Sequence, residues 1–418
     1  MIVTRWYRSF KDQIVNDREF SLFLLVSMFL GLAGGIYNTI FPNFLHDIWK
    51  VDETTRGFLE FPRESAGLIV LPIIGLLSFL GDIRTSRLTM ILNVVGLFGM
   101  ALLSPTYAVM AMWLFIFSLG QHVFMPLTPK IGMTLSKREN YGMRLARYGA
   151  YGLVAGIIGN GIAWVGWQVL HLGYTPLFII SGVFFACASV AMFMMKSDKP
   201  AQKPPKFIFR KQYSLYYALC LSNGARKQIF LTFAPWVLIQ VFKADVATMA
   251  ILGVVVSVVS VGTRTIVGRA IDTLGERKVL TFEACLLLLI CFGYAVSGNI
   301  FSTGVTFVII AACYIIDSSS SVVDMARSTY MRKIAVKESD ITPTLSAGVS
   351  LDHIMSMSIP ALGGLLWAAT GYESVFFVAA GIAVLNIVLT SRIKIKKAEA
   401  DEIPAPAADG IGSPEAEG

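Results

Sequence analysis

Charged residues are scarce in this chain. They make up 15% of its 418 residues, whereas hydrophobic residues make up 55%. In soluble proteins the charged share lies nearer a quarter. The mean hydropathy of +0.66 agrees with this shortage of charge. The composition therefore excludes a water-soluble globular protein and predicts one that crosses a membrane several times.

The sequence also lacks the patterns that carry soluble-enzyme chemistry. It has no Gly-rich phosphate loop with a lysine, no paired metal ligands and no nucleophile elbow. No polar segment is long enough for a catalytic domain. The cysteines lie inside apolar stretches without metal-type spacing, and we interpret them as packing residues: Cys187, Cys220, Cys285, Cys291 and Cys313. We expect no enzymatic activity, no cofactor and no metal site.

Long apolar stretches recur along the whole chain. A hydrocarbon core of about 30 Å needs roughly 20 helical residues per crossing. The sequence predicts an all-α fold with twelve spans, at residues 20–45, 56–80, 88–103, 108–131, 146–169, 175–195, 213–242, 246–267, 279–296, 304–324, 342–367 and 374–391.

The positive charges test these spans independently of hydropathy. Four cations lie within the spans, namely Arg63, Arg226, Lys227 and Arg264. All other Lys and Arg residues fall on one side except Lys50, Arg56 and Lys243. This asymmetry is the positive-inside pattern, and it predicts a multi-pass protein of the bacterial inner membrane with both termini in the cytoplasm. The net charge of +8 is spread over many loops rather than gathered in one stripe, so we expect anionic lipid and not nucleic acid as its partner.

A basic, proline-rich segment divides the chain in two. We predict an N-terminal cytoplasmic segment (1–19) that forms an interfacial helix, a first six-helix bundle (20–196), a cytoplasmic linker (197–212), a second six-helix bundle (213–392) and a disordered cytoplasmic tail (393–418). Two such bundles with a substrate site between them, near the bilayer midplane, are a common transporter architecture.

The two halves contain similar loops. Asp82 follows the second span and Asp272 follows the eighth, and each precedes cations at the start of the next span. The second loop keeps Gly268, Gly275, Arg277 and Lys278 around its acid, whereas the first has Asp82 and Arg87 with Ser78 and Thr85 at the glycine positions.

These loops, the twelve spans and the central linker resemble the major facilitator superfamily, whose signature reads approximately G-x-x-x-D-R/K-x-G-R/K-R/K. The resemblance covers residues 20–391. It implies that the loop charges control the conformational change, and we assign this role to Asp82, Arg87, Asp272, Arg277, Lys278 and Asp324. For Arg87 the alternative is an ordinary positive-inside residue.

Polar residues near the middle of the spans are the candidates for a substrate site, because a charge there costs at least about 2.5–3.5 kcal/mol. The resemblance places the first, fourth, seventh and tenth spans around a central cavity. The candidates for substrate binding are Asn38, Arg63, Gln121, Asn223, Arg226 and Lys227, and those for carrying a coupling proton are His122, Asp317, Asp352 and His353.

Arg226 or Lys227, with Arg63, is expected to hold an anionic group, while Asp317 or Asp352 carries the proton. Neighbouring residues point about 100° apart on a helix, so Arg226 and Lys227 cannot both face the cavity. The alternative is that these charges form buried ion pairs that lock the helices together.

Together these patterns predict a monomeric secondary transporter that works by alternating access, is driven by a proton gradient and moves a small organic anion. Two alternatives remain. One is a proton-driven exporter of lipophilic compounds, and the other is a membrane sensor or scaffold that moves no solute.

Overall fold

A computed structural model describes residues 17–135, 141–196, 210–320 and 323–394. Throughout these ranges the chain folds into helices joined by short turns, without strands, which confirms the all-α fold. A bilayer offers no water to the backbone, and a helix satisfies its backbone hydrogen bonds within the segment itself. Apolar spanning segments of this kind are therefore helical. The predicted interfacial helix, most of the linker and most of the tail lie outside the described residues.

The first half contains the first six spans. Its helices are α2 (Arg18–Asp47), α3 (Glu53–Leu68), α4 (Val70–Leu77), the short turn η1 (Ser78–Leu80), α5 (Asp82–Leu102), α6 (Tyr107–Thr134), α7 (Tyr141–Gln168) and α8 (Tyr174–Met194). The second predicted span is therefore built from α3, α4 and η1.

The second half contains the other six. Its helices are η3 (Lys211–Tyr213), α9 (Ser214–Trp236), η4 (Val237–Val241), α10 (Val246–Leu274), α11 (Glu276–Ile300), α12 (Thr303–Ser320), α13 (Asp324–Ile334), α14 (Glu338–Thr370) and α15 (Tyr372–Ser391).

Two predicted spans differ from a simple apolar helix. Among the described residues, 11 helices are long and apolar enough to cross a membrane, and α9 is not one of them because Arg226 and Lys227 lie at its centre. The tenth span was predicted as one helix over 304–324, but α12 ends at Ser320 and α13 begins at Asp324. Residues 321–322, between these two helices, lie outside the described residues, and one continuous helix over the tenth span stays a prediction.

Side-chain caps fix several helix starts. In four helices the residue before the first turn accepts a hydrogen bond from the backbone N–H three residues later, which is worth about 1 kcal/mol each. These caps are Asp17, Asp52, Thr106 and Asp245.

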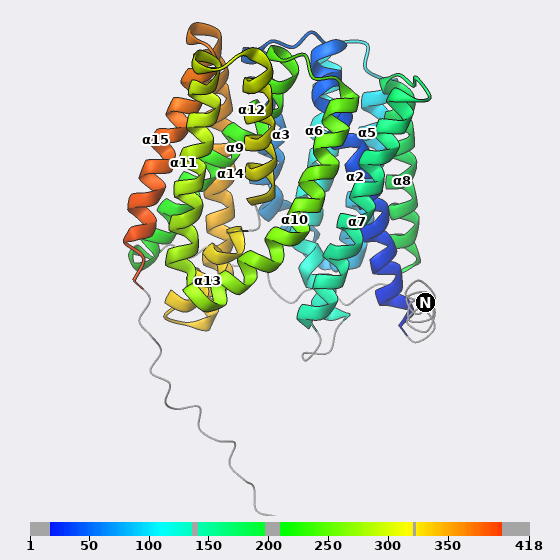
Figure 1. Ribbon diagram of the computed structural model, residues 1–418. Coiled ribbons are helices and arrows are strands. Elements are labelled where there is room, and N and C mark those ends of the chain that lie inside the picture. The colour runs from blue at the N-terminus through cyan, green and yellow to red at the C-terminus, as the bar shows by residue number, and fades with distance from the viewer. Residues whose placement is uncertain (1–16, 136–140, 197–209, 321–322, 395–418) are drawn as a thin grey trace, which may run out of the picture.

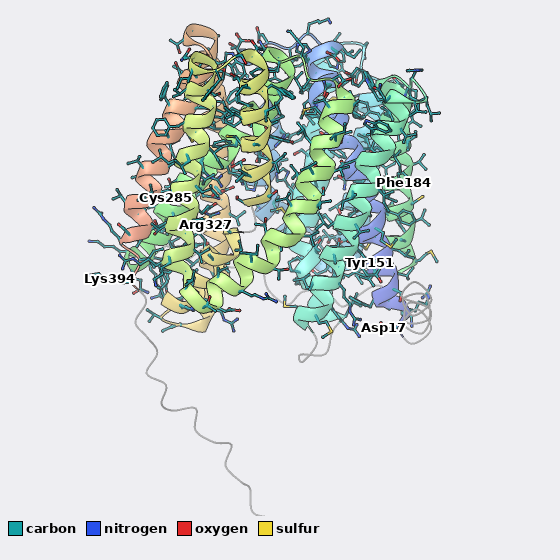
Figure 2. All side chains as sticks on the ribbon, in the orientation of Figure 1. Asp17, Tyr151, Phe184, Cys285, Arg327 and Lys394 are labelled. Carbon is teal, nitrogen blue, oxygen red and sulfur yellow. The ribbon has the colours of Figure 1, made fainter. Side chains whose placement is uncertain are left out.

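The helices form two side-by-side bundles, shown in Figure 1. We name the end where the chain passes from α2 to α3 the upper end, and the end where α2 begins the lower end. Asp17 and Lys394, near the two limits of the described chain, both lie at the lower end (Figure 2). The chain therefore crosses the bundle an even number of times.

The apolar core shows how the halves are joined. One large cluster at the upper end combines residues of both halves, such as Tyr37 and Phe41 of α2 with Phe233 and Trp236 of α9. At the lower end the core divides into two separate clusters, one within each half. The halves are thus packed together above and apart below.

Close helix contacts complete the upper seal. A Cβ atom on Gly57 of α3 would lie 2.2 Å from the carbonyl oxygen of Pro360 on α14, and one on Gly364 would lie 2.5 Å from that of Glu53. Only glycine allows backbones to approach so closely. Two hydrogen bonds add to the seal, from Asn43 Nδ2 to the carbonyl oxygen of Ala244 at 2.9 Å and from Gln240 Nε2 to Glu53 Oε2 at 2.8 Å.

Candidate functional site

The space between the halves is a ring of four adjoining cavities, with volumes of about 380, 340, 700 and 180 Å³. Neighbouring cavities share lining residues, namely His122, Lys227, Tyr314 and Leu30. Pro129 and Tyr216, in the lower parts of α6 and α9, also line them. The four cavities therefore adjoin one another, and two of them extend below the upper seal.

Lys227 of α9 faces this space. Its Nζ forms an ion pair with Asp352 Oδ2 of α14, and Asn223 Nδ2 donates to Asp352 Oδ1 at 3.3 Å. The Lys227 side chain is 31% exposed, so its charge remains accessible from the cavity.

Arg226, the next residue, points into its own half. Its Nη1 lies 3.0 Å from Asp317 Oδ1 of α12, and its Nη2 lies 3.6 Å from Glu283 Oε1 of α11. Nη2 also donates to Asn223 Oδ1 at 3.3 Å. With only 6% of its side chain exposed, Arg226 is held by two carboxylates, whereas Lys227 is the accessible cation. The two neighbours diverge as helix geometry requires.

Arg63 belongs to a charged ladder on α3. Its guanidinium lies 3.0 Å from Glu60 Oε2 and 3.1 Å from Glu64 Oε1, and Glu60 also pairs with Arg56. Glu60 Oε2 accepts a hydrogen bond from Gln228 Nε2 of α9 at 2.9 Å. The ladder thus connects the first half to the second near the middle of the spans.

A second connection joins Glu64 to two histidines. Glu64 Oε2 lies 3.1 Å from His353 Nδ1 of α14 and 3.8 Å from His122 Nε2 of α6. The two imidazole rings meet edge to face with centroids 5.1 Å apart. The structure therefore brings together His122 and His353, although they come from different halves.

The remaining two substrate candidates line the cavity from the first half. Asn38 of α2 borders the 380 Å³ part and Gln121 of α6 borders the 700 Å³ part. Both residues are exposed, so their side-chain amides are available to a solute.

Sequence reasoning did not include three buried acids in the site: Glu60, Glu64 and Glu283. Their side chains are 1%, 6% and 7% exposed. A usable signal was present on α3, because Glu60 lies four residues after Arg56 and three before Arg63, the spacing of side chains that meet on a helix. For Glu283 no local signal exists, since its partner Arg226 lies on another helix.

Among the side chains that the structure describes, the charges around the cavity match in number. The cations are Arg56, Arg63, Arg226, Lys227 and Arg327, and the carboxylates are Glu60, Glu64, Glu283, Asp317 and Asp352. With neutral histidines, this set carries no excess charge.

The lower-end loops correct the predicted repeat. Gly81 and Gly275 have nearly the same backbone angles (φ 82 and 81°, ψ 167 and 161°), and each immediately precedes the first helical residue of α5 or α11. A positive φ favours glycine, which fixes the register of the turn. The structural counterpart of Asp82 is therefore Glu276, not Asp272.

The ion pairs follow this corrected register. Asp82 Oδ1 pairs with Lys130 Nζ of α6 at 2.6 Å, and Glu276 Oε1 pairs with Lys333 Nζ of α13 at 2.6 Å. Arg87 Nε instead donates to the carbonyl oxygen of Met192 in α8 at 3.3 Å.

The other gating candidates are less engaged in this conformation. Asp272, Arg277 and Lys278 are exposed, and the described part of the chain gives none of them an ion pair. Asp324 begins α13, but its side chain lies outside the described residues.

Two helical halves around a charged cavity that is closed at one end form the architecture of a membrane transporter. The family model of the Major Facilitator Superfamily matches residues 23–342, so the chain belongs to this family. It is a multi-pass membrane transporter, not an enzyme. A search of curated proteins found no match.

Solved structures share the fold at low sequence identity. The nucleoside transporter NupG is 13% identical with a TM-score of 0.69, covering 90% of this chain and 98% of its own. A D-xylose-proton symporter is 11% identical with a TM-score of 0.67, covering 90% and 97%. A bacterial homologue of the human lysosomal transporter Spinster, in an inward-facing and occupied conformation, is 14% identical with a TM-score of 0.65, covering 90% and 96%. These likenesses concern the fold alone.

Proposed function

We propose that this protein is a proton-coupled secondary transporter that moves a small organic anion by alternating access. The observation that carries the proposal is the Lys227–Asp352 pair, which places an accessible cation in the cavity between the halves. A substrate carboxylate or phosphate can replace Asp352 as the partner of Lys227. The exposed amides of Asn38 and Gln121 can then hydrogen-bond polar groups of the same solute.

The conformation fits one end state of such a cycle. The positive-inside pattern assigns the lower end to the cytoplasm, so the cavity below the upper seal corresponds to an inward-facing state. Rocking of the two halves would break the α3–α14 contacts and open the upper end. A monomer in a bacterial inner membrane, with both termini in the cytoplasm, is part of the same proposal.

Charge balance supports coupling to protons. Because cations and carboxylates around the cavity match, an entering anion leaves an uncompensated negative charge near the midplane, which is costly. A proton taken up on a carboxylate removes that cost. Asp317 suits this role because it is 11% exposed, lines the same cavity as Lys227 and also holds Arg226. Protonation of Asp317 would accompany substrate binding and would weaken the ion pair between Asp317 and Arg226.

The charged lining argues against the alternatives. A site for lipophilic compounds is expected to be mainly apolar, whereas this cavity contains acids, bases and two histidines. Burying charged side chains in the membrane costs free energy. A scaffold that moves no solute would gain nothing from the buried ions on both sides of the junction between the halves.

A thermal-shift screen of the purified protein tests the proposed substrate class. Small organic acids are expected to raise the unfolding temperature, because a ligand that binds only the folded state stabilises it by mass action. Lys227→Met should lose the shift and Lys227→Arg should keep part of it, while Lys243→Met, in an upper loop, serves as the control. Stabilisation by neutral sugars or nucleosides but by no anion would refute the anion proposal.

A further inference from the structure

Three side chains at the junction of the halves have the chemistry of a metal site. Glu64 of α3, His122 of α6 and His353 of α14 each offer one ligand atom, and these atoms all lie within 4.8 Å of one another. Two imidazoles and one carboxylate are a ligand set that binds Zn²⁺. This cluster was not predictable from the sequence, because the three residues are far apart in the chain and show no ligand spacing.

The distances are close to those of a tetrahedral site. Metal–nitrogen and metal–oxygen bonds of about 2.0–2.2 Å place neighbouring ligand atoms about 3.3 Å apart. Glu64 Oε2 lies 3.1 Å from His353 Nδ1 and 3.8 Å from His122 Nε2. The nitrogens of the two histidines lie within 4.8 Å of each other, so side-chain movements of up to about 1.5 Å would complete the geometry.

Hydrogen bonds determine which nitrogen of His122 is available. His122 Nδ1 lies 2.9 Å from the carbonyl oxygen of Ser118, which can only accept, so Nδ1 carries the proton. The Ser118 hydroxyl, 3.0 Å from Nδ1, donates its own proton to the carbonyl oxygen of Arg63 and can likewise only accept from Nδ1. In a neutral ring Nε2 is then unprotonated and directed at Glu64. Metal-binding histidines show this arrangement, with the second ring nitrogen donating to a carbonyl.

The carboxylate is held in a similar way. Arg63 Nε and Nη2 donate to Glu64 Oε1 at 3.3 and 3.1 Å, while Oε2 faces both histidines. A lone pair of His122 facing a carboxylate is repulsive, and either a proton on Nε2 or a metal ion between the two groups removes this repulsion. The three ligands also border the 340 Å³ cavity, which leaves a fourth coordination position for water or a solute atom.

From this geometry we propose that Glu64, His122 and His353 form a binding site for a divalent transition metal, with Zn²⁺ the best fit. Because Glu64 and His122 belong to the first half and His353 to the second, a bound ion links the halves across the midplane. It therefore stabilises the conformation that is closed at the upper end. The proposal does not depend on the transported solute.

Metal binding to the purified protein, with any purification tag removed, tests this directly. Titration with Co²⁺ should give one equivalent per chain with the visible absorption of a four- or five-coordinate ion, and Zn²⁺ should displace it. His122→Asn and His353→Asn should each weaken metal binding by at least about 10-fold. Removing a residue that only hydrogen-bonds to a metal ligand already lowers the affinity by that much, and these two residues are the ligands themselves. His46→Asn, near the upper end, is the matched control and should bind normally.

Zn²⁺ should also raise the unfolding temperature of the parent protein reversibly, with EDTA restoring the original value. If a histidine variant does not fold, Glu64→Gln, which keeps the side-chain shape, replaces it in the comparison. The inference is wrong if the parent binds no Co²⁺ at neutral pH, if the ligand variants bind it as tightly as the control, or if the bound ion shows only oxygen ligands.

Discussion

Replacing Gly57 with alanine should shift the protein away from the conformation described above. The added Cβ would lie 2.2 Å from the carbonyl oxygen of Pro360, and a carbon–oxygen contact normally needs about 3.3–3.6 Å, so α3 and α14 must separate by about 1 Å. Overpacking of this kind costs about 1–3 kcal/mol. The contact joins the two halves only when the upper end is closed. The closed state should therefore lose about 5–150-fold in population relative to the open state.

Distance measurements between spin labels can detect this shift. In a background without the native cysteines, one label pair replaces Lys50 and Lys243 in the upper loops, and another replaces Thr134 and Thr273 at the lower ends of α6 and α10. In the Gly57→Ala variant the upper distances should lengthen and the lower distances shorten.

Gly75→Ala is the matched control, because it lies in the same span and its new Cβ would meet nothing within 4 Å. It should leave both distance distributions unchanged. If Gly57→Ala also leaves them unchanged, the α3–α14 contact does not determine which end is closed, and the reasoning fails.

Three further predictions concern single contacts, all read by thermal or chemical unfolding. Lys227→Met should destabilise the fold by about 1–3 kcal/mol, because it leaves the largely buried Asp352 carboxylate without its partner. Adding Asp352→Asn should restore most of the lost stability, and an equal loss in the single and the double variant would contradict the pairing. Glu276→Gln should destabilise by about 1–3 kcal/mol, whereas Asp272→Asn, at an exposed position, should have little effect, and the reverse order would reject the corrected repeat. Asp52→Ala should cost about 1 kcal/mol through the lost helix cap. Hydrogen bonds from Thr55 lower the pKa of Asp52, so the stability that its carboxylate contributes is present above the ordinary pKa of 3.8 and is lost as pH falls below it. Asp52→Asn should keep the cap without this loss of stability in acid. If the pH profile of stability is the same in Asp52→Asn and the parent, the carboxylate of Asp52 does not have this role.

The architecture was predictable because membranes impose strong rules. Apolar length, the positive-inside pattern and a polar central linker are each local properties of the sequence, and they identified the helices of both halves. Even α9, which is not among the helices apolar enough to cross a membrane, was included among the predicted spans as residues 213–242, and the charges of the loops on either side agreed with that assignment.

Pairings across the cavity were not predictable. Lys227 was expected to need a partner, but its ion pair with Asp352 depends on how α9 and α14 pack. Glu64 meets His353 only because the two halves close against each other, and no spacing in the chain reports that contact.

The loop register failed for a different physical reason. Aligning Asp82 with Asp272 matched residue types, whereas the turn is fixed by the positive φ of Gly81 and Gly275, which places Glu276 opposite Asp82. A backbone requirement of this kind is visible in dihedral angles but not in the chemistry of the side chains.

Proton movement in proteoliposomes tests the central claim most directly. The protein is reconstituted with a trapped pH-sensitive dye, and the organic acids that stabilise it in the binding screen are added outside. The account predicts that such an acid carries protons inward with the parent protein and that Asp317→Asn abolishes this flux while the acid still binds. Uptake of a bound anion without any proton flux, or undiminished flux in Asp317→Asn, would contradict it.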